Sequence, residues 1–284
     1  MPATKVVPKV LLPIGRKPLI LYAVEEAVAA GAECVVLVAN RRDSLISDYF
    51  KPNAELEDHL KHTGREEEAD SLDRFTQLIS IVTVLQESPR GLADAIRCAQ
   101  PIVGNQPFGV ILPDALILST HPAIGQLIHQ FEVNPSTLIA TRIVPRQETS
   151  RYGILVPRSQ HSSHRPQLFP VQALVEKPRP EVAPSLYGVF GRYILQPSIF
   201  AAIQSIHPDR SGELQLTDAL NHLCARYPVN ACLFEGEHYD TGEWLGFAQA
   251  SAACMLADPL YGGPFSKFLQ SLPELAPQAT PRHV

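Results

Sequence analysis

The first half of the chain alternates between short apolar runs and segments with a helical pattern, and this alternation constrains the fold most strongly. Residues 34–39 and 108–112 are continuous apolar runs of strand length, and residues 80–85 are rich in β-branched side chains. Residues 18–30 and 91–99 carry apolar positions at the spacing of a helix. Strands buried on both faces and separated by helices are typical of a parallel, doubly wound sheet. The sequence therefore predicts an α/β fold.

The second half of the chain mixes strand and helix patterns. Residues 158–170 are rich in Ser, His, Pro and Gln, which is typical of a loop. We expect residues 1–257 to form a single domain, and residues 258–284 to add a C-terminal helix and a Pro-rich tail. Strands are expected at residues 137–144, 152–156, 171–175 and 187–195, and helices at residues 197–206, 214–226 and 243–256.

Composition and charge argue against several classes of protein. The net charge of -5 argues against a nucleic-acid-binding surface, although it leaves room for a small basic phosphate pocket. Apolar residues make up 45% of the chain, yet no apolar run reaches the length that spans a membrane. The five cysteines are scattered and never spaced as CxxC, so we expect reduced thiols. These features predict a cytoplasmic protein with no nucleic-acid or membrane partner.

Two aspartates occupy positions where ligands are often bound. Asp114 comes just after an apolar run, and ligands of open α/β sheets bind outside the carboxyl ends of the strands. Asp240 lies in the segment Tyr-Asp-Thr-Gly, just before a predicted helix. Taken singly, Asp114 is explained as a turn residue and Asp240 as a helix cap. Together they match Mg²⁺, which is held by one or two carboxylates and by substrate phosphates.

The segment Val175-Glu176-Lys177-Pro178 ends another predicted strand, because proline removes a backbone donor. Lys177 could offer an ammonium group to a phosphate, and Glu176 could accept hydrogen bonds from sugar hydroxyls. The alternative is an ordinary solvent-exposed Glu–Lys pair at the end of a strand. The segment alone leaves both interpretations open.

A glutamine and three glycines are further candidates. The amide of Gln86 offers one donor and one acceptor, which can read the edge of a pyrimidine. Gly91 opens a predicted helix and would allow a ring to approach the backbone closely. Gly153 and Gly191 lie on predicted strands, where a glycine marks either a closely approaching ligand or a bulge.

In combination and in this order, the segments resemble the bacterial UTP–glucose-1-phosphate uridylyltransferases of the nucleotidyltransferase superfamily. The resemblance covers nearly the whole chain, to about Ala257, and VEKP with the VAPS that follows it favours this branch over the dTDP-sugar enzymes. The matching segments are PATKVVPK at residues 2–9, LLPIGRKPLI at 11–20, GLADAI at 91–96, ILPD at 111–114, YG at 152–153, VEKP at 175–178, GRYIL at 191–195, ELQLTDAL at 213–220 and YDTG at 239–242.

The resemblance implies a Rossmann-like mixed sheet and a reaction of UTP with glucose 1-phosphate that gives UDP-glucose and pyrophosphate. It also implies Mg²⁺ as the cofactor, UTP and glucose 1-phosphate as the small-molecule partners, and a homo-oligomer. The roles that it implies are contacts to phosphates for Lys9, to uracil for Gln86 and Gly91, to glucose for Gly153, Glu176 and Gly191, to the sugar phosphate for Lys177, and to the metal for Asp114 and Asp240.

Two departures from the family pattern change the expectation. The family carries a strand and a GxGTR loop before PATK, and this chain begins after them. Val10 stands where the family has Glu. Because such a loop supplies several donors to the triphosphate, and one donor is worth about 10²–10³ in rate, we expect turnover at least about a thousandfold slower than in a relative with the loop. The missing strand would also leave an unpaired edge beside residues 110–112.

Other interpretations stay open. The chain could be a non-catalytic homologue that binds or regulates an active uridylyltransferase, or it could act on another sugar 1-phosphate. Met1 could also be an internal methionine of a longer protein that carries the loop. Retention of Asp114, Lys177 and Asp240 favours an enzyme, since an interaction module does not need them.

Overall fold

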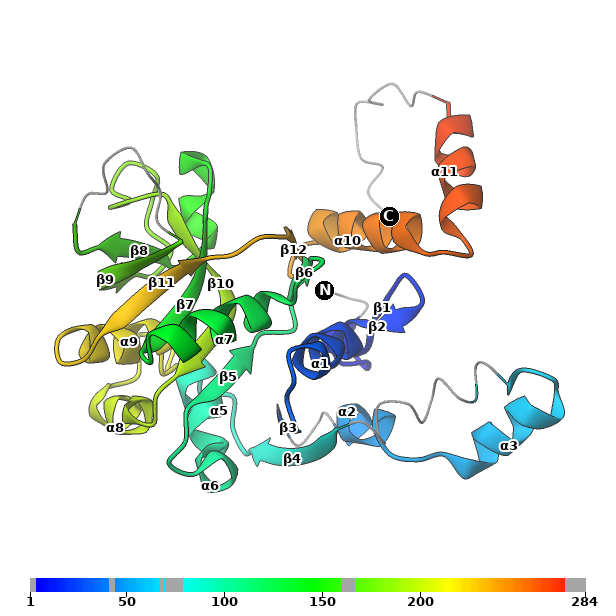
Figure 1. Ribbon diagram of the computed structural model, residues 1–284, viewed down its shortest axis with the longest axis horizontal. Coiled ribbons are helices and arrows are strands. Elements are labelled where there is room, and N and C mark those ends of the chain that lie inside the picture. Colours follow the sequence, from blue (N-terminus) through cyan, green and yellow to red (C-terminus); the bar gives the residue numbers. More distant parts are fainter. Residues whose placement is uncertain (1–3, 41–43, 67–68, 70–78, 160–166, 274–284) are drawn as a thin grey trace.

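A six-stranded mixed sheet is the largest sheet of the computed structural model (Figure 1). The structure describes residues 4–40, 44–66, 69, 79–159 and 167–273. The strands of the sheet are β5 (Phe108–Ile111), β7 (Thr137–Ile143), β8 (Ile154–Pro157), β9 (Leu168–Val175), β10 (Tyr187–Leu195) and β11 (Val229–Leu233). Their order is β5-β10-β7-β11-β9-β8, and β8 also bonds to β10. β7 and β11 run parallel, whereas the other pairings in this sheet are antiparallel.

Helices cover both faces of this sheet. Successive side chains of a strand point to opposite faces, so each strand supplies apolar residues to a core on either side. These helices are α5 (Leu92–Cys98), α7 (Ala123–Val133), α8 (Ser198–Ser205) and α9 (Leu216–Cys224). On β7, Ile139 belongs to the core shared with α5, α8 and α9, whereas Leu138 and Ala140 belong to the core shared with α7. Tyr193 and Ile194 of β10 divide between the two cores in the same way. The predicted α/β class with a mixed sheet is therefore confirmed.

The strands β3 (Cys34–Asn40) and β4 (Ser80–Gln86) form a separate parallel pair. They pack with α1 (Leu19–Ala29) and α2 (Ser44–Tyr49) around a small apolar core. Within the described ranges, β3 pairs only with β4 and β5 pairs only with β10, so each has one edge without a strand partner. The unpaired edge expected beside residues 110–112 is therefore present, and the sheet of the first half is divided there.

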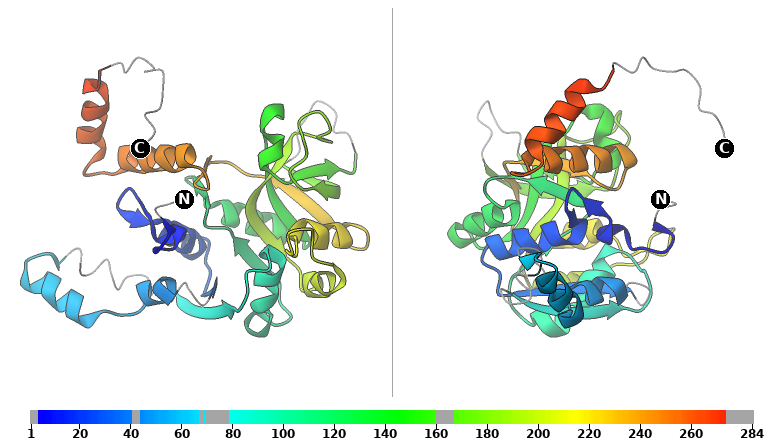
Figure 2. Two further views of the ribbon diagram at one scale, coloured as in Figure 1. Left: turned by 180° about the vertical axis from the view of Figure 1, so that it is seen from behind. Right: turned by 90° about the vertical axis from the view of Figure 1, so that its right-hand side faces the viewer.

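A short antiparallel pair connects the six-stranded sheet to the C-terminal helices. β6 (Ala115–Leu118), which follows β5 closely, pairs with β12 (Glu237–Asp240). β12 leads into α10 (Trp244–Ala257), and α11 (Gly262–Ser271) comes next. Both helices stand away from the six-stranded sheet in Figure 1 and in the left panel of Figure 2. None of the described helices has the length and apolarity needed to cross a membrane.

Some boundaries differ from those expected. β9 begins at Leu168, inside the segment expected to be a loop, because Phe169 is buried in the core between the sheet and α9. Residues 160–166 of that expected loop and residues 274–284 of the expected tail lie outside the described residues. The remaining elements are the 3₁₀ helices η2 (Lys9–Leu11) and η3 (Arg146–Arg151), the strands β1 (Pro13–Ile14) and β2 (Lys17–Pro18), and the helices α3 (Ala54–His62) and α6 (Gln100–Val103).

Candidate functional site

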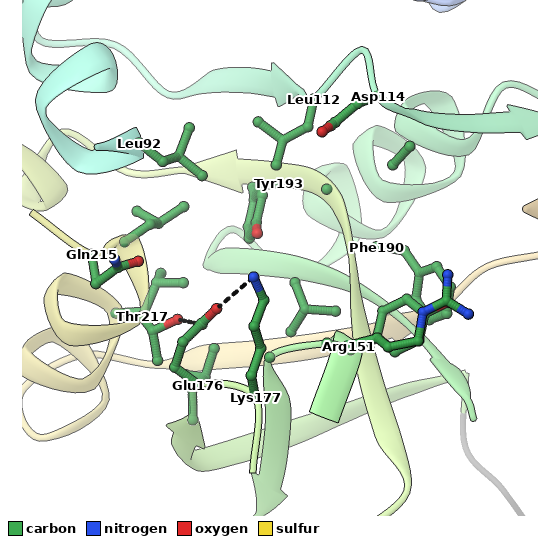
Figure 3. A pocket seen from close by; sticks show the side chains of 18 of the residues that line it. Leu92, Leu112, Asp114, Arg151, Glu176, Lys177, Phe190, Tyr193, Gln215 and Thr217 are labelled. Atoms are coloured by element: carbon green, nitrogen blue, oxygen red, sulfur yellow. Dashed lines mark hydrogen bonds and ion pairs between the residues drawn. The ribbon is translucent and has the colours of Figure 1, made fainter. Parts of the chain in front are cut away.

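A cavity of about 250 Å³ lies where the carboxyl end of β5, the middle of β10 and the start of α9 meet (Figure 3). Six of the nine residues predicted from the sequence line it. Lys9 is not a lining residue but forms an ion pair with Asp114, and Gln86 and Gly91 are not lining residues either, although Gly91 precedes the lining residue Leu92. The six predicted residues in the lining are Asp114, Gly153, Glu176, Lys177, Gly191 and Asp240.

Asp114 and Asp240 are brought together by the pairing of β6 with β12. The backbone N–H and the hydroxyl of Thr241 both donate to the carbonyl oxygen of Asp114, at 3.0 and 2.8 Å. Thr241 is fully buried, which fixes this junction. Both carboxylates stay accessible, since their side chains are 55% and 31% exposed. The fold therefore places two carboxylates at one rim of the cavity.

A cation accompanies each of these carboxylates. Lys9 Nζ lies 3.8 Å from Asp114 Oδ2, and Arg151 Nη2 donates to Asp240 Oδ2 at 2.9 Å. The N–H of Gly242 donates to Asp240 Oδ1 at 2.9 Å. A Cβ at Gly242 would lie 2.7 Å from Asp240 Oδ1 and 3.5 Å from Lys9 Nζ. The absence of a side chain at Gly242 therefore leaves room for the Asp240 carboxylate and the Lys9 ammonium group.

The donor set suits a divalent cation that also binds a substrate. In the part of the chain that the structure describes, His, Cys, Asp and Glu form no group of three or more that could hold a metal ion. Mg²⁺ takes one or two protein carboxylates and completes its octahedron with water and phosphate oxygens. Asp114 and Asp240 could supply such carboxylates, and phosphates bound in the cavity could supply the rest.

Glu176 and Lys177 extend into the cavity from the end of β9 (Figure 3). Thr217 Oγ1, in the first turn of α9, donates to Glu176 Oε2 at 2.6 Å, and Lys177 Nζ lies 4.0 Å from Glu176 Oε1. Lys177 has φ of 44°, the one positive φ at a non-glycine residue in the described ranges. Such a backbone conformation costs about 1–2 kcal/mol, and it persists only where the surrounding structure enforces it. The two side chains are solvent-exposed, at 61% for Lys177 and 41% for Glu176, so the strained backbone is what distinguishes this turn from an ordinary strand end.

Gly191 lies in a bulge of β10 and borders the cavity at the same time. The register of β10 against β7 shifts between Val189 and Tyr193, and Gly191 has φ of +63°. A Cβ at this position would lie 2.9 Å from Leu112 Cβ. At Gly153 a Cβ would approach Glu176 Oε2 at 3.4 Å. The register shift and the positive φ support the bulge interpretation of Gly191, and the ligand interpretation stays open because Gly191 also lines the cavity.

Gln86 and Gly91 are held by contacts within the protein. Gln86 Nε2 donates to Asp94 Oδ2 at 2.8 Å and to the carbonyl oxygen of Gly91 at 3.2 Å. Both amide hydrogens are therefore engaged, and Oε1 is the atom left to accept from a ligand. A Cβ at Gly91, where φ is +91°, would lie 2.7 Å from the carbonyl oxygen of Leu214. Contact with this neighbouring backbone is sufficient to explain the glycine.

Two polar residues of the cavity, Arg151 and Thr217, were missed by the sequence analysis. Arg151 is the last residue of η3 and comes directly before Tyr152 and Gly153, which line the same cavity. Thr217 lies within the ELQLTDAL segment, which could also be explained as a helix start. Their partners, Asp240 and Glu176, are distant in the chain, so only the folded structure reveals these contacts.

Tyr193 and His238, which also line the cavity, have pKa values shifted by burial. Burial, with a smaller effect from the charge of Glu176, raises the pKa of Tyr193 above its usual range, so the phenol stays neutral. Burial lowers the pKa of His238 to about 4, against the opposing charge of Asp240. Its ring packs edge-on against Phe190, with centroids 4.7 Å apart. Both side chains are therefore uncharged at neutral pH.

Comparisons with known proteins agree with this geometry. Residues 1–255 match the family described as Nucleotidyl transferase. The chain is 39% identical over 272 residues to UTP–glucose-1-phosphate uridylyltransferase 1 of Staphylococcus saprophyticus, covering 96% of this chain and 93% of the relative. It is 38% identical to UTP–glucose-1-phosphate uridylyltransferase YngB of Bacillus subtilis, covering 91% of this chain and 86% of the relative.

Solved structures show the same likeness. A UDP-glucose pyrophosphorylase from Acinetobacter baumannii superposes with a TM-score of 0.87 at 30% identity, covering 96% of this chain and 94% of that one. A UDP-glucose pyrophosphorylase complexed with UDP-glucose superposes with a TM-score of 0.78 at 35% identity, covering 89% and 92%. The resemblance drawn from the sequence motifs is confirmed, and the chain belongs to the nucleotidyl transferase family, alongside the UTP–glucose-1-phosphate uridylyltransferases.

Proposed function

We propose that this protein transfers a uridylyl group from UTP to glucose 1-phosphate, giving UDP-glucose and pyrophosphate. The observation that carries the proposal is the convergence, around one cavity, of a carboxylate pair suited to a metal ion with an ammonium group and a hydroxyl-binding carboxylate. These are Asp114 with Asp240, and Lys177 with Glu176. Relatives that cover 96% of the chain carry the name of this activity.

These residues would contact different parts of the two substrates. Glu176 and the backbone at Gly153 and Gly191 bind the glucose hydroxyls. The Lys177 ammonium offsets the charge of glucose 1-phosphate, while a phosphate oxygen of this substrate attacks the α-phosphorus of UTP. Lys9 contacts the phosphates of UTP, and pyrophosphate leaves. Asp114 and Asp240 would hold Mg²⁺, which when bound would neutralise charge on the phosphates.

The size of the cavity supports a proposal about which part of the reactants it would hold. At about 250 Å³, it is smaller than the 300–1,000 Å³ that is usual for sites enclosing a whole drug-sized ligand. We therefore assign it to glucose 1-phosphate and the reacting phosphate. Uracil would lie outside it, on the side of Gln86 and Gly91, where Gln86 Oε1 is the atom able to accept a hydrogen bond.

We further propose that the protein forms a homo-oligomer in the cytoplasm. α10, α11 and the residues that flank α11 carry several exposed large apolar side chains, which would lose contact with water in an interface. All five cysteines are free, which suits a reducing compartment. Light scattering after size exclusion measures the oligomeric state, and a monomer at micromolar concentration would contradict it. The exposed apolar residues are Trp244, Leu245, Leu256, Leu260, Tyr261, Phe268, Leu269 and Leu272.

Release of pyrophosphate from UTP, glucose 1-phosphate and Mg²⁺ tests the proposed reaction. Asp114→Asn and Asp240→Asn should each lower the rate by at least about a hundredfold, because each removes a charge that holds the metal at the reacting phosphates. dTTP in place of UTP, and galactose 1-phosphate in place of glucose 1-phosphate, measure the choice of base and sugar. Absence of product from the unmodified protein with every pair would contradict the proposal.

A further inference from the structure

Asp240 has a hydrogen-bond donor at each of its carboxylate oxygens. The N–H of Gly242 occupies Oδ1 and the guanidinium of Arg151 occupies Oδ2, both at 2.9 Å. The ion pair of the other carboxylate is looser, because Lys9 Nζ lies 3.8 Å from Asp114 Oδ2. A cation that binds at this rim therefore meets Arg151 as its competitor for Asp240.

The backbone that carries Arg151 is held firmly, while its guanidinium is accessible. In η3, the buried Thr149 donates through its hydroxyl to the carbonyl oxygens of Arg146 and Pro178, at 3.0 and 3.3 Å. The side chain of Arg151 is 43% exposed, and it lines the cavity (Figure 3). Its long, flexible chain can therefore reach either the carboxylate or an anion inside the cavity without moving the helix.

We propose that Arg151 is a positioning residue that holds Asp240 Oδ2 in the substrate-free protein, and that it moves to a substrate phosphate when this oxygen becomes a cation ligand. The inference rests on the function proposed above. A divalent cation bound to Asp240 Oδ2 would repel the Arg151 guanidinium strongly, since the guanidinium lies 2.9 Å from the same oxygen. The cations Lys9, Lys177 and Arg151 each face a carboxylate here, so a bound divalent cation would leave an excess of positive charge, and a phosphate is the partner that restores the balance. Arginine suits this task, because its planar fork binds phosphate oxygens in pairs.

The exchange has a consequence for the order and strength of binding. Without a phosphate ligand, the ion pair with Arg151 weakens the binding of a cation to Asp240. With a phosphate ligand, the released guanidinium gains a new partner, so the cation and the phosphate each strengthen the binding of the other. The Arg151–Asp240 pair would thus keep the metal from binding tightly before the substrate arrives.

Titration with MnCl₂, followed by the paramagnetic signal of free Mn²⁺, tests the first half of the proposal. Arg151→Gln should bind Mn²⁺ alone roughly two- to fivefold more tightly than the unmodified protein, since a partly exposed ion pair no longer competes. Calorimetry with UDP-glucose at saturating Mn²⁺ tests the second half. There the same variant should bind roughly tenfold or more weakly, because a charged hydrogen bond to phosphate is lost. A purely structural role would not shift the two affinities in opposite directions.

Arg146→Gln is the matched control, because Arg146 lies in the same 3₁₀ helix and donates to the carbonyl oxygen of Pro180 instead. It should change neither affinity. Mn²⁺ binding to Arg151→Gln that is no tighter than to the unmodified protein, or unchanged UDP-glucose binding, would overturn the inference while leaving the proposed reaction intact. Equal Mn²⁺ binding by the unmodified protein and by Asp240→Asn would instead overturn the metal site, and the inference with it.

Discussion

Arg192 and Glu26 form a buried, bidentate ion pair that joins β10 to α1. Arg192 Nε lies 3.0 Å from Glu26 Oε1, and Nη2 lies 2.8 Å from Oε2, although 166 residues separate the two along the chain. Arg192 Nη1 also donates to the carbonyl oxygen of Leu112 at 3.0 Å, and the N–H of Ile124 donates to Glu26 Oε1 at 2.9 Å. The pair therefore ties α1, the end of β5 and the start of α7 together beside the cavity.

Removing one member of this pair should destabilise the protein strongly. Arg192→Ala leaves a buried carboxylate without its charge partner, and we expect a loss of about 3–5 kcal/mol in the free energy of unfolding. Urea unfolding measures this loss. The double variant Glu26→Ala with Arg192→Ala should lose less than the sum of the two single variants, because no buried charge is then left unpaired. Additive losses would show that the two side chains act independently.

Lys177 combines backbone strain with a role in binding, and two substitutions separate these effects. Glycine adopts a positive φ freely, whereas alanine keeps the strain of about 1–2 kcal/mol. Glycine also adds entropy to the unfolded chain, which offsets about 0.4–1 kcal/mol of the stability gained by removing the strain. Lys177→Gly should therefore melt above Lys177→Ala. Both should bind glucose 1-phosphate roughly ten- to hundredfold more weakly by calorimetry, since both lack the ammonium group. Unchanged binding would mean that the segment is only a strand end.

Asp94 should make part of the free energy of unfolding depend on pH in the acidic range. Its burial alone would raise the pKa of the carboxyl, but hydrogen bonds from Arg97 and Gln86 and the charge of Arg90 outweigh burial and lower it. The carboxylate therefore stabilises the folded protein above the usual aspartate pKa of about 3.9, and this contribution is lost as the pH falls through the lowered folded-state value. The urea midpoint of the unmodified protein should exceed that of Asp94→Asn at pH 6, and the difference should shrink below about pH 4. A constant difference would contradict the assignment.

The free edges of β3 and β5 should make the protein prone to association through backbone pairing. We expect a melt below about 60 °C, with light scattering that rises during heating. Cys34→Lys, at the exposed start of β3, places a charge that opposes edge-to-edge pairing and should lower the scattering. Cys34→Ser removes the thiol without adding charge and is the control. Equal scattering of the two variants would point to thiol chemistry or to another surface.

Local patterns in the sequence were enough to predict several elements, and the missed elements have identifiable reasons. Continuous apolar runs predict strands at residues 34–39 and 108–112, and the structure places β3 and β5 there. The expected burial on both faces is wrong, since β3 buries only Leu37 and Ala39 and β5 buries none of its residues. α7 carries a detectable signal that was overlooked, since Ile124 and Leu127 are buried at helical spacing. β6 (Ala-Leu-Ile-Leu) carries an apolar run as long as that of β5 and was equally detectable, whereas β12 (Glu-His-Tyr-Asp) is polar and gives no such signal.

The candidate site shows a similar division between local and distant information. Asp114 could be singled out because it follows a strand, and its position in the cavity agrees with that reasoning. The pairing of Arg151 with Asp240 could not be inferred, since it depends on how η3 and β12 meet across 89 residues of sequence. The positive φ of Lys177 was equally hidden, because no rule of sequence demands it before a proline.

The lining residues of the cavity all come from position 92 onward, whereas Lys9 and Gln86 come from the part of the chain that precedes it. Under the proposed function, the residues that recognise the sugar and those that contact the nucleotide are therefore encoded in consecutive stretches of the sequence. Substitutions at Gln86, the last residue of β4, would then alter which nucleotide is accepted while the sugar preference is inherited unchanged. Homologues of this chain could thus diversify one specificity at a time.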